Sequence, residues 1–442
     1  MNIVLDALLD RKGALSRQIG EAKRAGQSID NLLAEMKTVS VKIKVERDNL
    51  KTKANTVKAK DVAVPDELRV LSSTPNLFDI YYTDECTKGD SAQSITIQHL
   101  DDDGDSVKWD YYVAHKENAS IYHFWEFKRI VQTSFGHKAI YLAAFDTDGG
   151  ICGVLPAIEM NSRLFGHFIV SLPYFTYGAA LADNESIENK LYVALIDYAK
   201  QENVQHVELR TMHEQKQLQG SAPSKENKVS MVRSLPDSSE QLWSDIGTKV
   251  RAQIKKAQRF DLEMKFGKAE LINDFYTVFS TNMRDLGTPV YSKSFFKELI
   301  KSRLHKQFDV GVVYFKGKAV ACCFLMTHQG MMEIPWASTL QSANGMNVNM
   351  FMYWEILQKA IVKECQFFDF GRSSKDAGTY RFKKQWGAQA QQLYWYYWLP
   401  DGESLPELNP NNPKYKLLIS VWQRLPVWLS QLIGPPVVKY LP

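Results

Sequence analysis

Cysteine is scarce in this chain of 442 residues, and its five occurrences form no C-x-x-C pair. Cys322 and Cys323 are adjacent within an apolar run, which predicts small core residues in a reducing cytoplasm. The chain also lacks any run of about 18 uncharged apolar residues, so we expect no membrane span. Its first residues, MNIVLDALLD, have no basic region ahead of an apolar core, and no signal peptide is predicted.

The signatures of several enzyme classes are missing as well. The sequence contains no G-x-S-x-G nucleophile elbow, no H-E-x-x-H and no kinase or Rossmann glycine fingerprint. The segment 311–318 resembles a P-loop, but it has one residue too many before its second glycine and no Ser or Thr after Lys318. The histidines have no cysteine partners, so no metal site is predicted.

What the chain does have is the composition of a folded protein with an uneven distribution of charge. Hydrophobic residues make up 45% and charged residues 24%, and the length suits two or three domains. Residues 1–60 carry 13 Lys and Arg against 7 Asp and Glu, whereas the remainder carries 41 against 43. The basic character therefore belongs to the N-terminal end.

Residues 1–62 are predicted to form two helices that pair as an antiparallel coiled-coil hairpin. Apolar residues of the second helix follow a 3-4 heptad spacing, and Gly26 and Ser28 suit the end of one helix and the start of the next. The stretch RKGALSRQIGEAKRAGQSIDNLLAEMKTVSVKIK (11–44) resembles the N-terminal arm of seryl-tRNA synthetases, which implies contact with tRNA. A coiled coil that only dimerises or spaces the protein is the alternative.

After the arm, strand and helix patterns alternate in two similar halves. Each half has a hairpin, a long helix and a strand that ends in a carboxylate followed by an arginine, Glu208-Leu209-Arg210 and Asp369-Phe370-Gly371-Arg372. This predicts an α/β fold with mixed sheets, built from two tandem copies of one unit. The predicted parts are the arm (1–62), a linker (63–92), a first unit (93–240), a second unit (241–400) and an apolar tail (401–442).

The stretch FDFGRSSKDAGTYRFKKQWGA (368–388) is the strongest candidate for a binding site. It passes from an apolar strand through a glycine-containing loop into an aromatic and basic segment, and α/β proteins bind ligands at such carboxyl ends of strands. Its basic side chains predict an anionic ligand.

Several stretches in one order resemble the FemABX family, and most closely its exosortase-associated (PEP-CTERM) FemAB-like members. They include GVLPAIEMNSRLFG (153–166), NMRDLGTPVYSKSFF (282–296), EIPWAS (333–338) and the stretch 368–388. The resemblance covers roughly residues 93–440 and implies that both halves have the GNAT acyltransferase fold. It further implies acyl transfer, without a resident cofactor, to an anionic cell-envelope or exopolysaccharide precursor.

The resemblance leaves the acyl donor open between aminoacyl-tRNA and acyl-CoA. The loop that would bind the pyrophosphate of CoA reads QSANGMNVNMFMYW (341–354), with only Gly345, which weakens the case for acyl-CoA. Two other functions stay open: a CoA-dependent N- or O-acetyltransferase, and a non-catalytic adaptor whose arm binds RNA or a partner coiled coil. Binding to DNA is not expected.

Three residues are candidates for catalysis. Glu333 lies on the strand that corresponds to the central GNAT strand, where a general base often lies, although an ion pair or a solvated position would also suit it. Asp369 ends an apolar strand and would orient the substrate, or else pair with Arg372 or cap a helix. Tyr291 would act as general acid, or else form a buried structural hydrogen bond.

A further set of residues is predicted to bind substrate. Arg372 would clamp a phosphate with two hydrogen bonds, the basic residues after it would approach the same anion, and two first-half residues would line the acceptor cleft. Ion pairing, solvation and aromatic packing are the structural alternatives. The set comprises Arg372, Lys383, Lys384, Arg381, Arg284, His137 and Tyr177.

The tail contains LLISVWQRLPVWLSQLIGPPVVKYLP (417–442), which is apolar but interrupted by Arg424 and three prolines. We expect it to pack back on its own protein, and the alternative is peripheral contact at the inner face of a membrane.

Overall fold

The structure is a computed structural model that describes residues 95–215, 223–375, 377–403, 405 and 413–441. Near the N-terminus it describes only positions 18, 35, 38 and 39. The chain divides into two compact units, Met1–Pro75 and Asn76–Pro442. The predicted helical hairpin, its tRNA contact and the linker lie outside the described residues. Every helix and strand from Thr96 onward belongs to the second unit.

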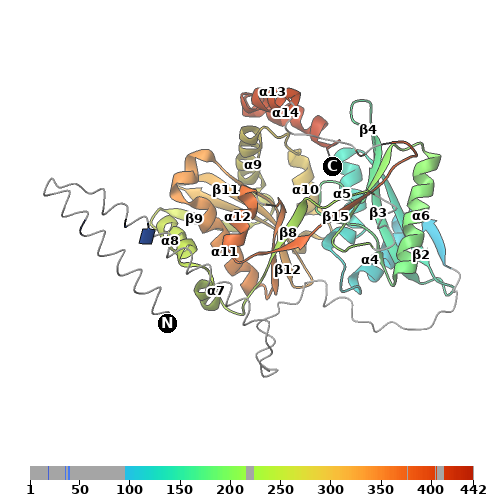
Figure 1. Ribbon diagram of the computed structural model, residues 1–442, viewed down its shortest axis with the longest axis horizontal. Helices are drawn as coiled ribbons and strands as arrows, with labels where there is room; N and C mark the ends of the chain where they lie inside the picture. Colours follow the sequence, from blue (N-terminus) through green and yellow to red (C-terminus); the bar gives the residue numbers. More distant parts are fainter. Residues whose placement is uncertain are drawn as a thin grey trace, which may run out of the picture. The chain divides into compact units, whose positions relative to one another are not determined.

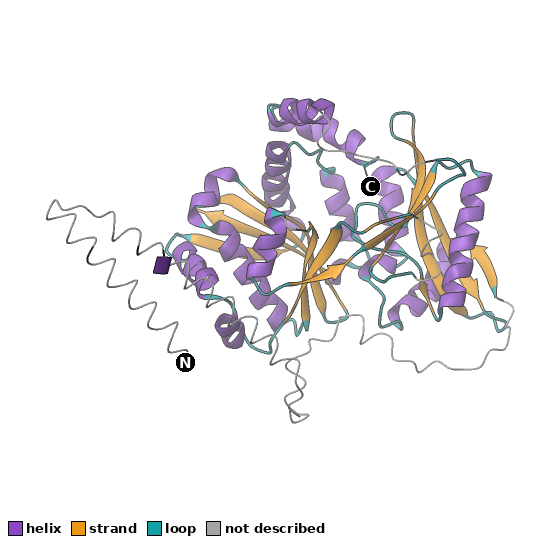
Figure 2. Cartoon of the chain, in the orientation of Figure 1, coloured by secondary structure: helices purple, strands orange, loops and turns teal. Residues whose placement is uncertain are grey.

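The first half of this unit is built on a mixed sheet of eight strands in the order β1-β2-β3-β4-β6-β15-β7, with β5 pairing β3. Figure 2 shows it as one of two groups of strands, each flanked by helices. The elements are β1 (Thr96–His99), α4 (Ser106–Ala114), η2 (Ile121–His123), α5 (Glu126–Phe135), β2 (Lys138–Phe145), β3 (Ile151–Ser162), β4 (Gly166–Val170), β5 (Leu181–Ala182), α6 (Glu185–Gln201), β6 (His206–Thr211), β7 (Ser224–Lys225) and β15 (Tyr394–Trp398).

The second half is built on a seven-stranded mixed sheet in the order β14-β8-β13-β12-β11-β10-β9. Its elements are β8 (Lys228–Ser234), α7 (Ser239–Asp245), α8 (Thr248–Ala257), β9 (Leu262–Gly267), α9 (Ile272–Leu286), α10 (Lys293–Lys301), β10 (Phe308–Phe315), β11 (Lys318–His328), β12 (Met331–Thr339), α11 (Val348–Val362), β13 (Phe367–Ser374), α12 (Gly378–Gln385) and β14 (Gln389–Gln392). The predicted fold class, two tandem α/β units with mixed sheets, is confirmed.

Turn chemistry in the sequence sets the ends of these elements. The hairpin of β10 and β11 turns through Lys316 and Gly317, both with positive φ, as a two-residue turn that matches strand twist requires. Helix α9 ends at Gly287, whose φ of 76° is the left-handed conformation that favours glycine. Ser292, which caps α10, accepts a hydrogen bond from the Phe295 backbone N–H.

The two sheets exchange strands. β8 lies before the predicted boundary between residues 240 and 241, yet it pairs with β13 and β14 of the second sheet. β15 lies after this boundary and returns to pair with β6 and β7 of the first sheet (Figure 1). Each sheet therefore includes one strand from the other side of that predicted boundary.

A shared apolar core joins the halves. One cluster of buried side chains runs from Leu100 to Leu393 and includes residues of both halves. Aromatic rings meet across it: Phe175 lies 6.1 Å from Trp336, and Phe135 lies 5.1 Å from Phe295, between ring centroids. Burial of such rings contributes about 1.5–3 kcal/mol each, so the halves stabilise one another.

The C-terminal helices α13 (Pro413–Gln423) and α14 (Val427–Val438) pack on α9. Gly287 lies directly against Ile419, and Gly434 against the Val290 backbone. Within the ranges that the structure describes, no helix is both long and apolar enough to cross a bilayer.

Candidate functional site

The two central strands of the second half separate at one point. β12 and β13 run parallel and pair only from Met331 to Glu333, with Phe367 to Asp369 opposite. Directly beyond, each strand bulges away from its outer neighbour: Ile334 and Pro335 face the single Leu325, and Phe370 and Gly371 face the single Met231. β-Bulges bend a strand and re-aim its side chains.

The residue types at these bulges explain them. Pro335 has no backbone N–H to give to a ladder, and Gly371 has a φ of 78°, which is typical of glycine in a bulge. A Cβ at Gly371 would lie 3.3 Å from the Ile334 carbonyl oxygen, so the strands are still close there. The divergence therefore opens beyond a paired Glu333 and Asp369.

These two carboxylates are buried side by side. Burial and, second to it, the neighbouring Asp369 raise the pKa of Glu333 to about 8, although hydrogen bonds from the Tyr122 and Tyr177 hydroxyls act in the opposite direction. Burial also raises the pKa of Asp369, which accepts hydrogen bonds from the Ser230 hydroxyl (2.6 and 2.7 Å) and the Gly371 N–H (2.7 Å). Because two adjacent buried carboxyls resist joint ionisation, the pair holds a proton near neutral pH.

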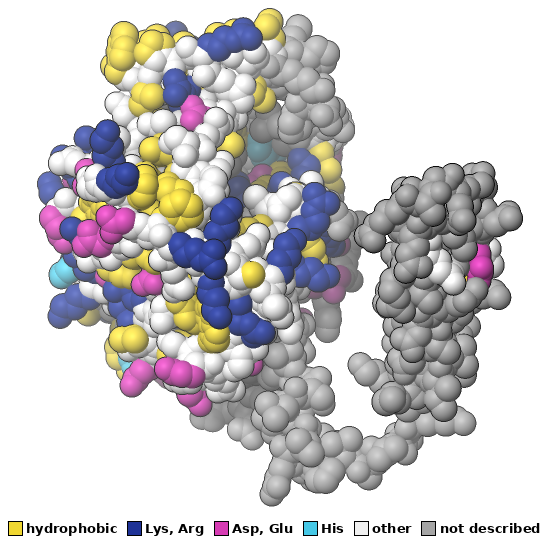
Figure 3. Space-filling view, turned by 90° about the vertical axis from the view of Figure 1, so that its left-hand side faces the viewer, with side chains coloured by type: hydrophobic (Ala, Val, Ile, Leu, Met, Phe, Trp, Pro, Cys, Tyr) yellow, Lys and Arg dark blue, Asp and Glu magenta, His cyan; other side chains and the backbone are white. Residues whose placement is uncertain are grey.

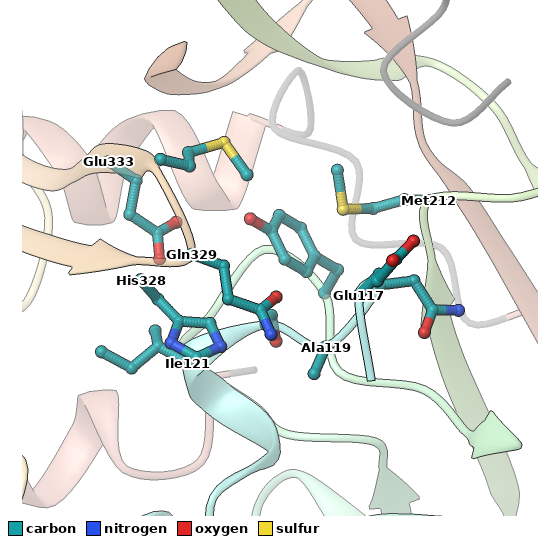
Figure 4. A pocket seen from close by; sticks show the side chains of 11 residues that line it. Glu117, Ala119, Ile121, Met212, His328, Gln329 and Glu333 are labelled. Carbon is teal, nitrogen blue, oxygen red and sulfur yellow. The ribbon is translucent and has the colours of Figure 1, made fainter. Parts of the chain in front are cut away.

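Glu333 opens onto a pocket between the halves. Figure 4 shows Glu333, His328 and Gln329 on one side of it and Met212 and Glu117 on the other. Residues 117–121 and Tyr177 complete its first-half wall. A second pocket shares Tyr177 and Met212 with it and reaches Arg210. These two adjoining pockets, which together form the cleft, thus lead from Glu333 to the end of β6.

Two arginines, one from each half, lie over the ring of Trp395. The guanidinium carbons of Arg210 and Arg372 are 4.6 and 5.0 Å from the indole centroid. Arg210 is fully buried and paired with Glu208 at 2.6 Å. Within the described part of the chain, the Arg372 guanidinium makes no ion pair, and the Trp395 Nε1 finds no acceptor.

The accessible surface of the Arg372 side chain is that of an exposed residue. Its pKa is nevertheless lowered to about 10, first by burial and second by repulsion from Arg210. The side chain therefore reaches solvent from within a recess surrounded by protein. The structural alternative, pairing of Arg372 with Asp369, is not what the structure has. An unpaired guanidinium beside a second cation favours an anionic ligand, which would relieve the repulsion.

Tyr291 lies near this recess. Its ring packs among Phe135, Phe295 and Trp336. Burial raises the pKa of its hydroxyl, and the charges of Arg372 and Arg210 act in the opposite direction. The phenol is therefore close to the two arginines.

The basic residues of α12 differ in their surroundings. Lys383 is buried, and its Nζ donates to the backbone carbonyls of Gly371 and Arg372 at 2.8 and 2.9 Å. It thus holds the bulged end of β13, and burial lowers its pKa to about 8. Arg381 and Lys384 are exposed on the same helix.

The remaining two predicted residues meet the C-terminal helices. Arg284 pairs with Asp285 at 2.7 Å and donates to the Leu425 carbonyl at 2.7 Å. His137 is 2.6 Å from the Lys439 carbonyl oxygen, so its Nε2 is the donor, and burial lowers its pKa. The structure therefore places Glu333 and Tyr177 in the wall of the cleft, holds Asp369, Arg372 and Lys383 at the bulged end of β13 with Tyr291 near Arg372, and engages Arg284 and His137 with the tail.

Comparison with known proteins agrees with this geometry. Residues 246–384 match the family model of the acetyltransferase (GNAT) domain. The second half contains a GNAT domain. It includes Glu333, Asp369, Tyr291 and Arg372, whereas Tyr177 and Arg210 reach the cleft from outside it. No curated protein matches the chain.

Solved structures extend the likeness to both halves. FemX is similar over 73% of this chain and 100% of its own, at 13% identity and a TM-score of 0.53, which shows a FemX-like fold. The L-PGS of Bacillus licheniformis is 13% identical over 68% of this chain and 98% of its own, with a TM-score of 0.45. The tandem GNAT protein from the clavulanic acid biosynthesis pathway is 9% identical over 71% and 100%, with a TM-score of 0.46.

The first half repeats the pair of diverging parallel strands of the GNAT domain, but there the chain that follows β4 fills the gap between the strands. β4 and β6 run parallel from Phe168 to Val170 opposite His206 to Glu208, so Glu208 corresponds to Asp369. The chain beyond β4 then occupies the divergence: the Ser171 N–H donates to the Glu208 backbone carbonyl, and the Gly178 N–H donates to the Arg210 backbone carbonyl. Only the second-half divergence carries a carboxylate pair.

The sequence did not single out four residues of this site. Tyr122 bonds Glu333, Ser230 bonds Asp369, His328 lines the pocket, and Trp395 lies beneath both arginines. His123 was also missed: it joins Ser120 to the Ala179 carbonyl and so connects two walls of the cleft. Apart from the aromatic run around Trp395, no sequence signal marked them. In the described ranges, no three His, Cys, Asp or Glu side chains form a metal-ligand set.

Proposed function

We propose that this protein is a FemAB-type acyltransferase that moves an acyl or aminoacyl group from an activated donor to an anionic acceptor. The acceptor class is a cell-envelope or exopolysaccharide precursor that carries an amine or hydroxyl. The main support is the buried pair of Glu333 and Asp369, which lies where β12 and β13 diverge and opens onto a cleft between the halves.

Glu333 is the general base in this proposal. A pKa of about 8 suits a base that must take a proton from an amine or hydroxyl near neutral pH. As the proton passes to Glu333, the acceptor forms its bond to the acyl carbon, and the carbonyl electrons move onto oxygen. Collapse of that intermediate expels the CoA thiolate or the ribose oxygen of tRNA, and Glu333 returns the proton to it through Tyr122 or Tyr177.

Arg372 holds the anionic part of a substrate. It is unpaired among the described residues, and Arg210, Trp395 and Tyr291 lie beside it with further N–H and O–H donors. Asp369 and Lys383 are positioning residues: Asp369 adds to the effect of burial in raising the pKa of Glu333, and Lys383 fixes the backbone of Gly371 and Arg372. Arg381 and Lys384 contribute exposed positive charge on α12.

The donor is either aminoacyl-tRNA or acyl-CoA. The basic N-terminal end supports tRNA, because clustered Lys and Arg suit phosphate contacts. The match of residues 246–384 to the acetyltransferase domain favours the second candidate function, a CoA-dependent acetyltransferase. An adaptor without catalysis has no use for a buried carboxyl pair that opens onto a cleft.

A transfer assay tests the proposal. Full-length protein would be incubated with radiolabelled aminoacyl-tRNA or acetyl-CoA and a panel of nucleotide-linked amino sugars and peptides. We expect transfer with one donor, which Glu333→Gln reduces by about 10²–10⁴-fold. Glu355→Gln is the matched control, because burial also raises the pKa of Glu355 but the residue does not line the pocket.

Arg372→Ala separates binding from chemistry in the same assay. Loss of the guanidinium should raise the KM of the anionic substrate by about 10–100-fold, as for a charged hydrogen bond, with a smaller effect on kcat. If neither donor gives transfer and neither shifts the melting temperature, the adaptor replaces the enzyme. Full activity of Glu333→Gln would remove the assignment of the base.

A further inference from the structure

Helix α14 presents its large apolar side chains outward. The residues that it buries are Ser430, Gly434 and Val438, at intervals of four, where it packs on the rest of the unit. On the opposite side, Trp428 and Leu432 are 66% and 65% exposed. A helix on the surface of a globular protein has the reverse arrangement, with its apolar stripe toward the core.

Helix α13 continues this surface. Leu417, Leu418 and Val421 are exposed, and with Ile419, Trp428, Leu432 and Ile433 the two helices hold seven of the fourteen exposed large hydrophobic side chains of the described residues. Isolated exposed apolar residues are normal, but this many on two adjoining helices indicates a partner.

The charge of the segment indicates which partner. Residues 413–442 contain no Asp or Glu and four basic residues, Lys414, Lys416, Arg424 and Lys439. Hydrophobic and basic side chains gather together at the top of the space-filling view (Figure 3), where Figure 1 places α13 and α14. Trp428 is of the type that concentrates at the boundary between lipid headgroups and acyl chains.

The two helices are held in place from the side that faces the protein. The Lys439 carbonyl accepts hydrogen bonds from His137 and from the Tyr174 hydroxyl (2.6 and 2.5 Å), and Arg284 bonds the Leu425 carbonyl. A close contact of Gly434 with the Val290 backbone fixes α14 on the unit. The apolar surface is therefore presented on a fixed support.

We propose that α13 and α14 dock the protein on the surface of an anionic phospholipid bilayer. α14 has 12 residues, about 18 Å of helix, whereas a hydrocarbon core is about 30 Å thick, so the helices lie in the interface. The apolar side chains enter the headgroup boundary, and Arg424 meets phosphate groups. Two signals of this kind, apolar and basic, act together in reversible membrane binding.

Vesicle co-sedimentation of the full-length protein tests this. We expect binding to vesicles of phosphatidylcholine with about one-third phosphatidylglycerol, weaker binding at high salt, and little binding to pure phosphatidylcholine. Trp428→Ser with Leu432→Ser should lower the partition coefficient at least about tenfold, since two large apolar side chains no longer enter the interface. Val107→Ser with Tyr111→Ser on α4 is the matched control, because these side chains are equally exposed.

Arg424→Glu is a second test variant that leaves the apolar surface intact, and it should weaken binding to the anionic vesicles only. Three results would overturn the proposal: no binding to anionic vesicles, equal loss in the α4 control, or no loss in either tail variant. Self-association at micromolar concentration that the tail variant abolishes, without vesicle binding, would assign the surface to a second copy of the chain.

Discussion

The proton on Glu333 couples the stability of this protein to pH. In the folded state burial and Asp369 hold its pKa at about 8, against an ordinary value of 4.5. Between these values the folded state keeps a proton that the unfolded chain releases, so the free energy of unfolding falls as pH rises from about 4.5 to about 8. The raised pKa of Asp369 acts in the same direction.

Glu333→Gln should therefore flatten the dependence of stability on pH. The amide keeps the hydrogen bonds of a neutral carboxyl, so the two proteins should be about equally stable near pH 4.5. Near pH 9 the variant should be more stable by a few kcal/mol, at about 1.4 kcal/mol per unit of pKa shift. Urea unfolding across this range measures the difference, and parallel curves would mean that Glu333 is ionised in the fold at neutral pH.

The same group should govern the pH dependence of catalysis. If Glu333 is the base, kcat/KM of the free enzyme should rise tenfold per pH unit and level off near pH 8, since only the carboxylate accepts a proton. Glu333→Asp should retain a rise with pH but lower the plateau, because the shorter side chain withdraws the carboxylate from its acceptor. A flat profile between pH 6 and 9 would contradict this role.

How far the sequence predicts this site depends on where each residue lies. Glu333 could be found because its strand corresponds to the central GNAT strand, and Asp369 and Arg372 because an apolar run meets a glycine there, although β13 continues past both to Ser374. Tyr122, Ser230 and His328 reach the carboxylates from other elements through tertiary contacts, and no local pattern marks them. Arg284 and His137 had suitable chemistry for a site, but the structure engages them with the tail.

The bulge of β13 makes the divergence of the central strands sensitive to a single methyl group. Gly371→Ala puts a Cβ at a φ of 78° and 3.3 Å from the Ile334 carbonyl oxygen. The left-handed conformation alone costs a residue with a side chain about 1–2 kcal/mol. We expect a loss of at least that much stability, measured by urea unfolding, together with lower activity, because the strands must shift beside Glu333 and Asp369.

Gly378→Ala is the matched control for this element. Gly378 begins α12, has no positive φ and has open space around its Cα, so a methyl group there should be neutral or slightly stabilising. If both alanine variants behaved alike, the bulge would not be under strain, and the divergence would have to be set by packing alone.

The elements themselves were mostly predictable, whereas their pairing was not. The hairpins at Asp148-Gly149-Gly150 and Lys316-Gly317, the long helices and the strands that hold Glu208 and Asp369 follow from turn residues and periodicity. The exchange of β8 and β15 between the sheets joins residues about 140–190 positions apart, such as Ser230 with Arg372 and Trp395 with Arg210. Local periodicity carries no information about such pairing.

This exchange has a consequence for how the whole unit folds. A chain cut between residues 240 and 241 separates β8 from the second sheet and β15 from the first, and it also divides the apolar core that both halves share. We expect neither fragment to fold alone, and we expect the intact unit that begins at Asn76 to unfold in urea as one cooperative transition. Fluorescence and circular dichroism should report the same midpoint.

A cut at another position shows whether the loss of these strand pairings, and not chain cleavage as such, prevents folding. A protease site inserted at 216–222, between β6 and β7, leaves β8 covalently joined to the second half, and β15 can still pair with β6. The nicked protein should therefore remain a complex on gel filtration and keep its circular dichroism.

If residues 241–442 folded alone, or if the two halves of the intact protein unfolded in two separate transitions, the strand exchange would add little stability. The cleft between the halves would then depend on side-chain packing alone. If the fold is one cooperative unit, Tyr177 and Arg210 of one half stay fixed against Glu333 and Arg372 of the other, as a site shared by both halves requires.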